Sequence, residues 1–169
     1  IHTRDFMWRM GVNLTHYKNV VTDLPLKDMP VTGVTRLKEG RSVYDFYLRE
    51  WVGVDPDNGD PLWYKNVKDE QGNITGRTTT NDYAQADYYY VDKSSLPKVY
   101  GGFNTAFSYK GFELSAIFAY SIGGYIVDRD VTMLWSNGSN PGRAWSTEIL
   151  KRWTPENRYT DVPALKTVS

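Results

Sequence analysis

Cysteine is absent from this 169-residue sequence, and its absence excludes a disulfide scaffold, a thiolate zinc site and a cysteine nucleophile. Net charge is absent too, because 20 Lys and Arg balance 20 Asp and Glu, so we expect no nucleic-acid partner. No apolar run reaches the roughly 18 residues of a membrane-spanning helix. The nearest run, Leu114 to Val127, contains two Ser and two Gly, so contact with a membrane would require a β-barrel.

Sequence signatures of catalysis are missing. His2 and His16 are fourteen positions apart, a spacing that fits neither a metal site nor a catalytic triad. There is no nucleophile elbow, zinc-protease helix, phosphate loop or dinucleotide fingerprint. The Asp-rich segment Gly53 to Tyr64 lacks the EF-hand pattern, because Gly59 and Asn66 occupy loop positions that need carboxylates. We therefore expect no enzyme, no catalytic residue, no metal site and no cofactor.

Aromatic residues, in contrast, are abundant. They make up 15% of the chain, with 13 Tyr and 6 Trp. Rings of this kind are typical of the girdle of a membrane barrel, and equally of a carbohydrate-binding surface. Both interpretations therefore stay open on composition alone.

Apolar and polar residues alternate from Tyr100 to Tyr120, with Ile117 as the one exception. A period of two over this length predicts strands and not a helix. The two strands join at Lys110-Gly111, where Gly111 supplies the positive φ that a tight hairpin turn needs. Rings flank this turn, where an outer-membrane barrel would have its interfacial aromatic residues.

The same alternation runs from Phe6 to Thr15 and is broken only by Met7. Its length of about ten residues matches a tilted barrel strand and is long for a soluble sheet. We predict strands over about residues 6–17, 99–109 and 112–122. The apolar residues that we expect to face lipid are Phe6, Trp8, Met10, Val12, Leu14, Phe103, Phe107, Leu114 and Phe118.

The remaining stretches, about 18–98 and 123–169, are rich in Pro, Gly and Asp and predict long loops. Short strands are expected within them at Ser42 to Leu48 and in a polar hairpin of Trp63 to Val67 with Ile74 to Thr80. The run Tyr83 to Tyr90 is interpreted as a solvated loop that packs on itself, with a sugar-stacking platform as the alternative. The segment Thr147 to Arg152 predicts one short helical turn with Thr147 as its N-cap.

Four ordered phrases carry a family resemblance: DFMWRMGVNLTHYKNVV, GVDPDNGDPLWY, LPKVYGGFNTAFSYKGFELSAIFAYSIGG and KRWTPENRYTDVPAL. They resemble the late barrel portion of SusC/RagA-like TonB-dependent outer-membrane transporters of Bacteroidetes. The family's N-terminal signal, TonB box and plug domain have no counterpart here, and Ile1 is not an initiator Met. We therefore expect a fragment of one barrel domain.

The resemblance implies an all-β fold, namely part of a transmembrane antiparallel β-barrel of about 22 strands with long extracellular loops. It implies import of oligosaccharides or peptides through the bacterial outer membrane. The implied partners are a SusD-like surface lipoprotein, TonB through the missing N-terminal part, the remaining barrel strands of the same protein and outer-membrane lipid. Nothing in the resemblance distinguishes the two kinds of cargo.

Barrels of this kind keep short turns at the periplasmic end, which predicts that Lys110-Gly111 is periplasmic. Residues 18–98 then make an even number of membrane crossings. We favour zero, and two crossings by Ser42 to Leu48 and Trp63 to Val67 are the alternative. With zero crossings, the rings of both loops lie at the cell surface.

These loops are our candidate contact surface for cargo or partner, because rings bury large areas at little cost in entropy. The candidates are Trp63, Tyr64, Tyr88, Tyr89, Tyr90, Trp135 and Trp145, with Trp51 and Trp153 in the same loops. The alternative function is a secreted, soluble carbohydrate-binding β-sandwich, since alternation alone does not separate lipid from a core.

Overall fold

The computed structural model describes residues 1–26, 29–135 and 142–165. Its strands are β1 (Phe6–Thr15), β2 (Asp45–Arg49), β3 (Trp51–Val54), β4 (Pro61–Lys68), β5 (Ile74–Thr80), β6 (Tyr88–Ser94), β7 (Val99–Tyr109) and β8 (Phe112–Ile122). Its helices are short: η1 (Tyr83–Gln85), α1 (Arg129–Leu134) and η2 (Thr147–Lys151). The strands form three sheets, in the orders β1-β7-β8, β2-β6 and β3-β4-β5. The fold is all-β, as predicted.

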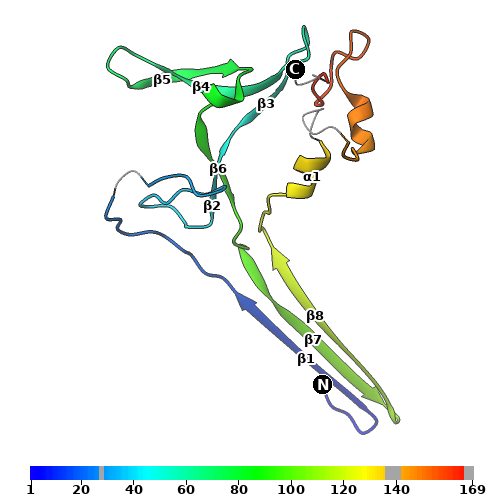
Figure 1. The fold of residues 1–169 in the computed structure, drawn as a ribbon. Coiled ribbons are helices and arrows are strands. Elements are labelled where there is room, and N and C mark those ends of the chain that lie inside the picture. The colour runs from blue at the N-terminus through cyan, green and yellow to red at the C-terminus, as the bar shows by residue number, and fades with distance from the viewer. Residues whose placement is uncertain (27–28, 136–141, 166–169) are drawn as a thin grey trace. The chain divides into compact units, whose positions relative to one another are not determined.

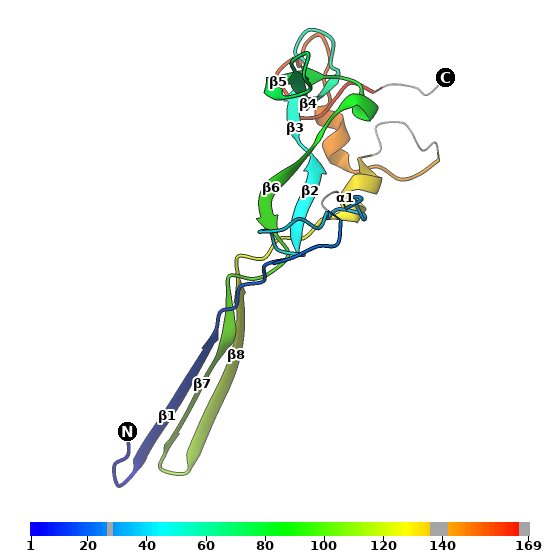
Figure 2. The same cartoon turned by 90° about the vertical axis from the view of Figure 1, so that its left-hand side faces the viewer.

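The sheet β1-β7-β8 is a long antiparallel ladder without a bulge. β1 pairs with β7 from Phe6↔Tyr109 to Thr15↔Tyr100, and β7 pairs with β8 from Val99↔Ile122 to Tyr109↔Phe112. Figures 1 and 2 show the three strands side by side along their whole length. Although residues 16–98 separate β1 from β7 in sequence, β1 and β7 are direct neighbours in this sheet.

The turn between β7 and β8 has positive φ at both central residues, 46° at Lys110 and 88° at Gly111. Two positive φ values define a type I′ turn, whose twist matches that of the flanking strands. The sequence predicted a positive φ only at Gly111. Lys110 takes the same region because the twist of the two long strands requires it.

A second turn lies at the same end of the sheet. The Lys110 amide donates to the Asp5 carbonyl at 3.2 Å, so the segment before β1 adjoins the Lys110-Gly111 turn. Ile1 and Trp8 exchange two hydrogen bonds of 2.8 Å each, and His2 bridges to Met7. These bonds lie on the edge of β1 opposite β7, because antiparallel strands use alternate residues for their two neighbours.

The chain divides into two compact units, one of residues 1–46 and 92–126 and the other of residues 47–91 and 127–169. The first holds β1, β7 and β8. The second holds β3, β4 and β5, in which the predicted polar hairpin is present as β4 and β5, paired from Trp63↔Thr80 to Lys68↔Ile74. The Asp69 carboxylate closes this hairpin by accepting hydrogen bonds from Gln71 and Asn73.

The structure corrects several local predictions. Tyr83 to Tyr90 is not a solvated loop, because it contains η1 and the start of β6, with Tyr89 buried. The strand predicted at Ser42 begins at Asp45, since the Asp45 carboxylate accepts the Ser42 amide in a tight turn before it. The N-cap of η2 is Ser146, whose hydroxyl accepts the Glu148 amide, and not Thr147. No prediction covered β3 or α1.

Buried apolar residues are few and lie outside the long sheet. Among the described residues they are Phe46, Ala86, Tyr89, Ile149 and Val162. None belongs to β1, β7 or β8, so this sheet packs no core of its own against either face. None of the helices in the described ranges has both the length and the apolar character that a bilayer crossing demands.

Candidate membrane-facing sheet and binding loops

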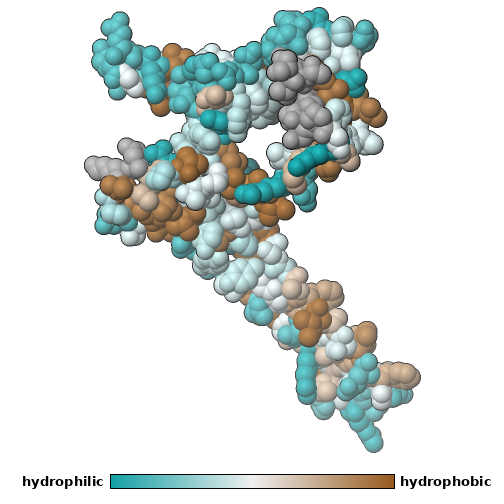
Figure 3. Space-filling model, in the orientation of Figure 1, coloured by the Kyte–Doolittle hydropathy of each residue, from teal (hydrophilic) through white to brown (hydrophobic). Residues whose placement is uncertain are grey.

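The register of the long sheet places all nine predicted lipid-facing residues on one face. Cross-strand partners share a face, and Trp8 pairs with Phe107, which pairs with Leu114. The same holds for Val12, Phe103 and Phe118, and the rings of the last two stack at 5.9 Å. Much of this face is uncovered: Val12 is 66% exposed and Leu114 59%. Figure 3 shows apolar patches among polar ones on the visible side of this sheet.

Polar groups on the apolar face are bonded within the sheet. The Trp8 indole donates to the Thr105 hydroxyl at 2.9 Å. The Tyr120 hydroxyl donates to the Asn13 carbonyl at 2.7 Å, and its ring crosses Gly101, where an added Cβ would lie 2.6 Å from the hydroxyl oxygen. A hydrocarbon environment requires such internal pairing, because it offers no water to an unpaired polar group.

Rings mark both ends of this face. Phe6, Tyr109 and Phe112 lie in one row beside the turn, and Tyr120 lies near the opposite end. A strand of ten residues at about 3.3 Å per residue, tilted by about 45°, covers roughly 23 Å. That height matches the apolar band of an outer-membrane barrel, about 25 Å between its two aromatic girdles.

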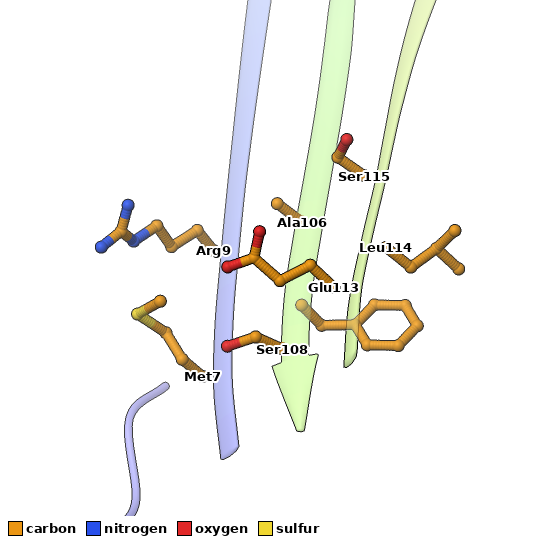
Figure 4. Close-up of a pocket in the computed structure, with 8 residues that line it drawn as sticks. Met7, Arg9, Ala106, Ser108, Glu113, Leu114 and Ser115 are labelled. Atoms are coloured by element: carbon orange, nitrogen blue, oxygen red, sulfur yellow. The ribbon is translucent and has the colours of Figure 1, made fainter. Parts of the chain in front are cut away.

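The opposite face is polar. Figure 4 shows Arg9, Ser108 and Glu113 on one side of the sheet and Leu114 on the other. Arg9, Ser108 and Glu113 line a hollow of about 410 Å³, together with Ala106 and Ser115. Met7 and Ile117, the latter 87% exposed, are the large aliphatic exceptions on this face. One apolar face without a core, one polar face and aromatic ends define this sheet as part of the wall of a transmembrane β-barrel.

The predicted loop rings gather in the second unit, where two arginines join them. Trp63 lies edge-on between Trp51 and Tyr83, with ring centres 5.7 and 5.1 Å away. The Arg49 guanidinium stands 4.2 Å from the Tyr83 ring and 4.7 Å from that of Tyr88. These contacts hold β3, β4, η1 and β6 together, and they leave Trp51 and Tyr83 about half exposed.

Tyr89 is the most enclosed of the predicted rings. Its hydroxyl donates to the Asn66 side chain at 2.9 Å, and the Arg77 guanidinium lies 4.1 Å from its ring and 5.5 Å from that of Tyr64. Burial, with a smaller contribution from the Asp87 charge, raises the pKa of Tyr89 above its usual value. Its surroundings therefore suit a neutral phenol that packs the loops.

The other predicted rings have separate surroundings. Tyr88 and Tyr90 both contact the Tyr47 ring, at 5.5 and 4.7 Å. Trp135 is the C-cap of α1 and donates its amide to the Val131 carbonyl at 2.9 Å. Trp145 is 41% exposed. The sequence analysis did not include Tyr83 or Tyr159 among the candidate contact rings. The signal that could have indicated them is that each is an aromatic residue within a polar stretch of the loops.

The described ranges 1–26, 29–135 and 142–165 contain no group of three His, Cys, Asp or Glu side chains close enough to hold a metal ion. The Asp55 carboxylate, first in the Asp-rich loop, accepts hydrogen bonds from the Asp57 amide and the Asn58 side chain. Asp60 is buried and accepts a hydrogen bond of 2.7 Å from Asn81. The carboxylates of this loop thus shape the loop itself.

No protein-family model matches the sequence. Two curated proteins of Formosa agariphila are similar over 96% of the chain: TonB-dependent receptor P3, 27% identical, and TonB-dependent receptor P26, 26% identical. The chain spans 17% of the length of each. Similar solved structures are the RagAB peptide transporter, with a TM-score of 0.83 and 28% identity, and the RagAB peptide importer in its "closed-closed" state, with 0.81 and 28%. They cover all of this chain, which matches 19% of theirs.

The similarity in sequence and in fold confirms the resemblance carried by the four phrases. The chain is similar over nearly its whole length to TonB-dependent receptors and to one part of the RagAB peptide transporter, in keeping with a barrel segment of the SusC/RagA-like kind. Its location is the bacterial outer membrane. The relatives are receptors and transporters by name, which agrees with the expectation that the protein is not an enzyme.

Proposed function

We propose that this protein imports an oligomeric nutrient, a peptide or an oligosaccharide, across the outer membrane with energy delivered by TonB. The observation that carries the proposal is the uninterrupted ladder of β1, β7 and β8, with one apolar and one polar face. Such a ladder functions only as part of a closed wall, because lipid tolerates no unpaired strand edge. The similarity to a TonB-dependent receptor and to the RagAB peptide transporter supports the same function.

The wall is completed by other strands of the same protein. Among the described residues, no strand pairs with the edge of β8 opposite β7. At the other edge, Ile1 and His2 already bond to β1, in the direction that a preceding barrel strand would take. TonB contacts the protein through an N-terminal part that is separate from this segment.

The nine apolar residues face lipid, and the polar face with Arg9 and Glu113 lines the lumen. The loops of residues 18–98 and 123–169 then lie at the cell surface, where a SusD-like lipoprotein covers the barrel as a lid. Their rings supply the contact area for lid or cargo: Trp63, Tyr64, Tyr88, Tyr89, Tyr90, Trp135 and Trp145. The uncovered apolar face argues against a soluble β-sandwich, which would bury that face against a second sheet.

Uptake by the full-length transporter tests this function. The gene is deleted from its host, the full-length protein or a variant is restored, and uptake of labelled peptide and oligosaccharide mixtures is measured with and without TonB. Trp63, Tyr64, Tyr89 and Trp135 are each changed to Ala, and lid association is measured by co-purification. Each variant is compared only if it inserts into the outer membrane as the wild type does.

We expect TonB-dependent uptake of one class of oligomer, and weaker lid association or uptake in at least one ring variant. Wild-type uptake of neither class would refute the import function. Unchanged lid association and uptake in all four variants would show that these rings only hold the loops folded. The lid and the cargo would then contact other parts of the transporter.

A further inference from the structure

Two segments of the second unit interlock in a clasp, which we define as residues 55–60 together with residues 149–164. The Trp153 indole and the Arg158 side chain both donate to the Pro56 carbonyl, at 3.1 and 2.8 Å. Arg158 also forms an ion pair of 2.7 Å with Asp57. The Ala164 amide donates to the Gly59 carbonyl at 2.9 Å. Four bonds thus join segments that are about a hundred positions apart in sequence.

Packing closes the clasp at Gly59. This glycine has a φ of 75°, and an added Cβ would lie 2.7 Å from the Trp153 ring and from the Ala164 side chain. Only a residue without a side chain fits there, both for its backbone and for its neighbours. The Ile149 and Val162 side chains nearby are each 4% exposed, so the clasp has a small core of its own.

Tyr159 belongs to the segment that the clasp holds in place, and its side chain lies in solvent. It is 93% exposed, the largest exposed fraction among the large apolar and aromatic residues of the described chain. The residues around it are held: Asn157 donates to the Lys151 and Arg152 carbonyls, and the Thr160 hydroxyl donates to the Lys151 carbonyl at 2.7 Å. A ring presented from a rigid segment loses little entropy when it binds.

A hollow of about 390 Å³ adjoins this ring. Apolar surface comes from Val54 and Pro56, and polar groups come from Arg158, Thr160 and Asp161. The Arg158 charge is neutralised by Asp57. Within the described part of the chain, no hydrogen bond or ion pair occupies the Asp161 carboxylate, so it remains available as an acceptor for a ligand.

The lining combines an aromatic ring and apolar surface with a carboxylate acceptor, which suits a ligand rich in hydroxyl groups. The Asp161 carboxylate would repel an anion, and the Arg158 guanidinium adds no net charge because it is paired with Asp57. A pyranose ring satisfies both surfaces, because its C–H face packs on an aromatic ring while its hydroxyls donate to a carboxylate. The mixture of apolar and polar lining is that of a small ligand site.

We propose that the clasp holds Tyr159 and Asp161 as the contact residues of a surface site for one pyranose unit of an oligosaccharide. The proposal rests on the proposed import function and assigns its cargo to the oligosaccharide class. Tyr159 stacks on the sugar ring and Asp161 accepts its hydroxyls. Gly59 and Trp153 are positioning residues, which act only by fixing the segment that carries the two contacts.

Binding to the full-length transporter in detergent tests the site. Calorimetry with maltohexaose, laminarihexaose, mannohexaose and xylohexaose identifies the best sugar, and a mixed hexapeptide library serves as the comparison. We expect Tyr159→Ala to weaken the best sugar about tenfold, which corresponds to one aromatic contact. Tyr159→Phe should keep nearly all of the affinity, since the ring is retained, and Asp161→Ala should weaken binding to a similar degree as Tyr159→Ala.

Glu156→Ala is the matched control, because Glu156 is an exposed carboxylate of the same segment that does not line the hollow. Its affinity should equal that of the wild type. The proposal is overturned if none of the four sugars binds, if peptides alone bind, or if Tyr159→Ala binds sugar as the wild type does. Uptake of peptide with no sugar binding would overturn this site and leave the import function intact.

Discussion

An arginine in place of Met10 should destabilise the protein in its membrane, because of the depth at which the register of the sheet places this residue. Met10, Thr105 and Ala116 form the fifth row from the Lys110-Gly111 turn, in a ladder whose first strand has ten rows. This row is therefore close to the middle of the apolar band. Met10 is 57% exposed on the apolar face, so a guanidinium there would project into hydrocarbon if this face meets lipid, as we propose.

The magnitude depends on depth. Arginine on the lipid face costs about 2–4 kcal/mol at the bilayer midplane and about 0–1 kcal/mol near an interface. Leu114 lies two rows from Met10, roughly 5 Å along the membrane normal at a strand tilt of about 45°. We expect the cost to decrease in the order Met10→Arg, Leu114→Arg, Phe112→Arg, since Phe112 lies beside the turn.

The assay is reversible denaturant unfolding of the full-length protein in lipid vesicles, followed by tryptophan fluorescence. Ser115→Arg is the control, because Ser115 neighbours Leu114 and points to the polar face. It should change the free energy of unfolding by about 0.5 kcal/mol or less. Equal costs for Met10→Arg and Ser115→Arg would refute the assignment of the two faces.

Three further predictions concern the loops. Gly59→Ala should destabilise the clasp by about 1–3 kcal/mol through strain and contact with Trp153, and limited proteolysis of the loops should become faster; an unchanged cleavage rate would exclude a tight fit at Gly59. Hydrogen bonds from the Asn73 backbone and side chain lower the pKa of Asp69, so its contribution to the β4-β5 turn is complete above the unfolded pKa of about 3.9 and is lost as the pH falls through the lower folded value. Hydrogen exchange at the Asn73 amide should therefore show less protection at low pH, and Asp69→Asn should remove this dependence; equal pH dependence in both proteins would contradict the assigned cause. Tyr89→Phe should lower the free energy of unfolding by about 0.5–1.5 kcal/mol, the value of one hydrogen bond, because the bond from the Tyr89 hydroxyl to Asn66 is lost. No change in the free energy of unfolding would mean that water satisfies Asn66 equally well.

The long sheet could be predicted from the alternation of residues alone. A strand places successive side chains on opposite faces, so the order Phe6, Met7, Trp8 already separates an apolar from a polar side. The Lys110-Gly111 dipeptide located the turn, because a two-residue hairpin needs positive φ. The same local logic located the β4-β5 hairpin. The four ordered phrases then indicated the family, which the similarity to known transporters confirms.

The pattern of neighbouring residues did not predict the structure of the loops, because loop residues contact segments that are distant in sequence. The surroundings of Tyr88 to Tyr90 depend on Arg49, Arg77 and Tyr47, which lie on other strands, and no period in the sequence predicts such contacts. Ring exposure therefore could not be derived from the sequence.

Periodicity thus accounts for the strands of the membrane sheet, their two faces and their turn, all of which can be derived from the order of residues. The way in which the loop residues meet depends instead on the folded chain. Gly59 and Trp153 lie close together although ninety-four positions separate them in sequence, and in the same folded segment Tyr159 is left in solvent. Alternation is a property of one strand, whereas contacts between distant segments depend on the whole chain.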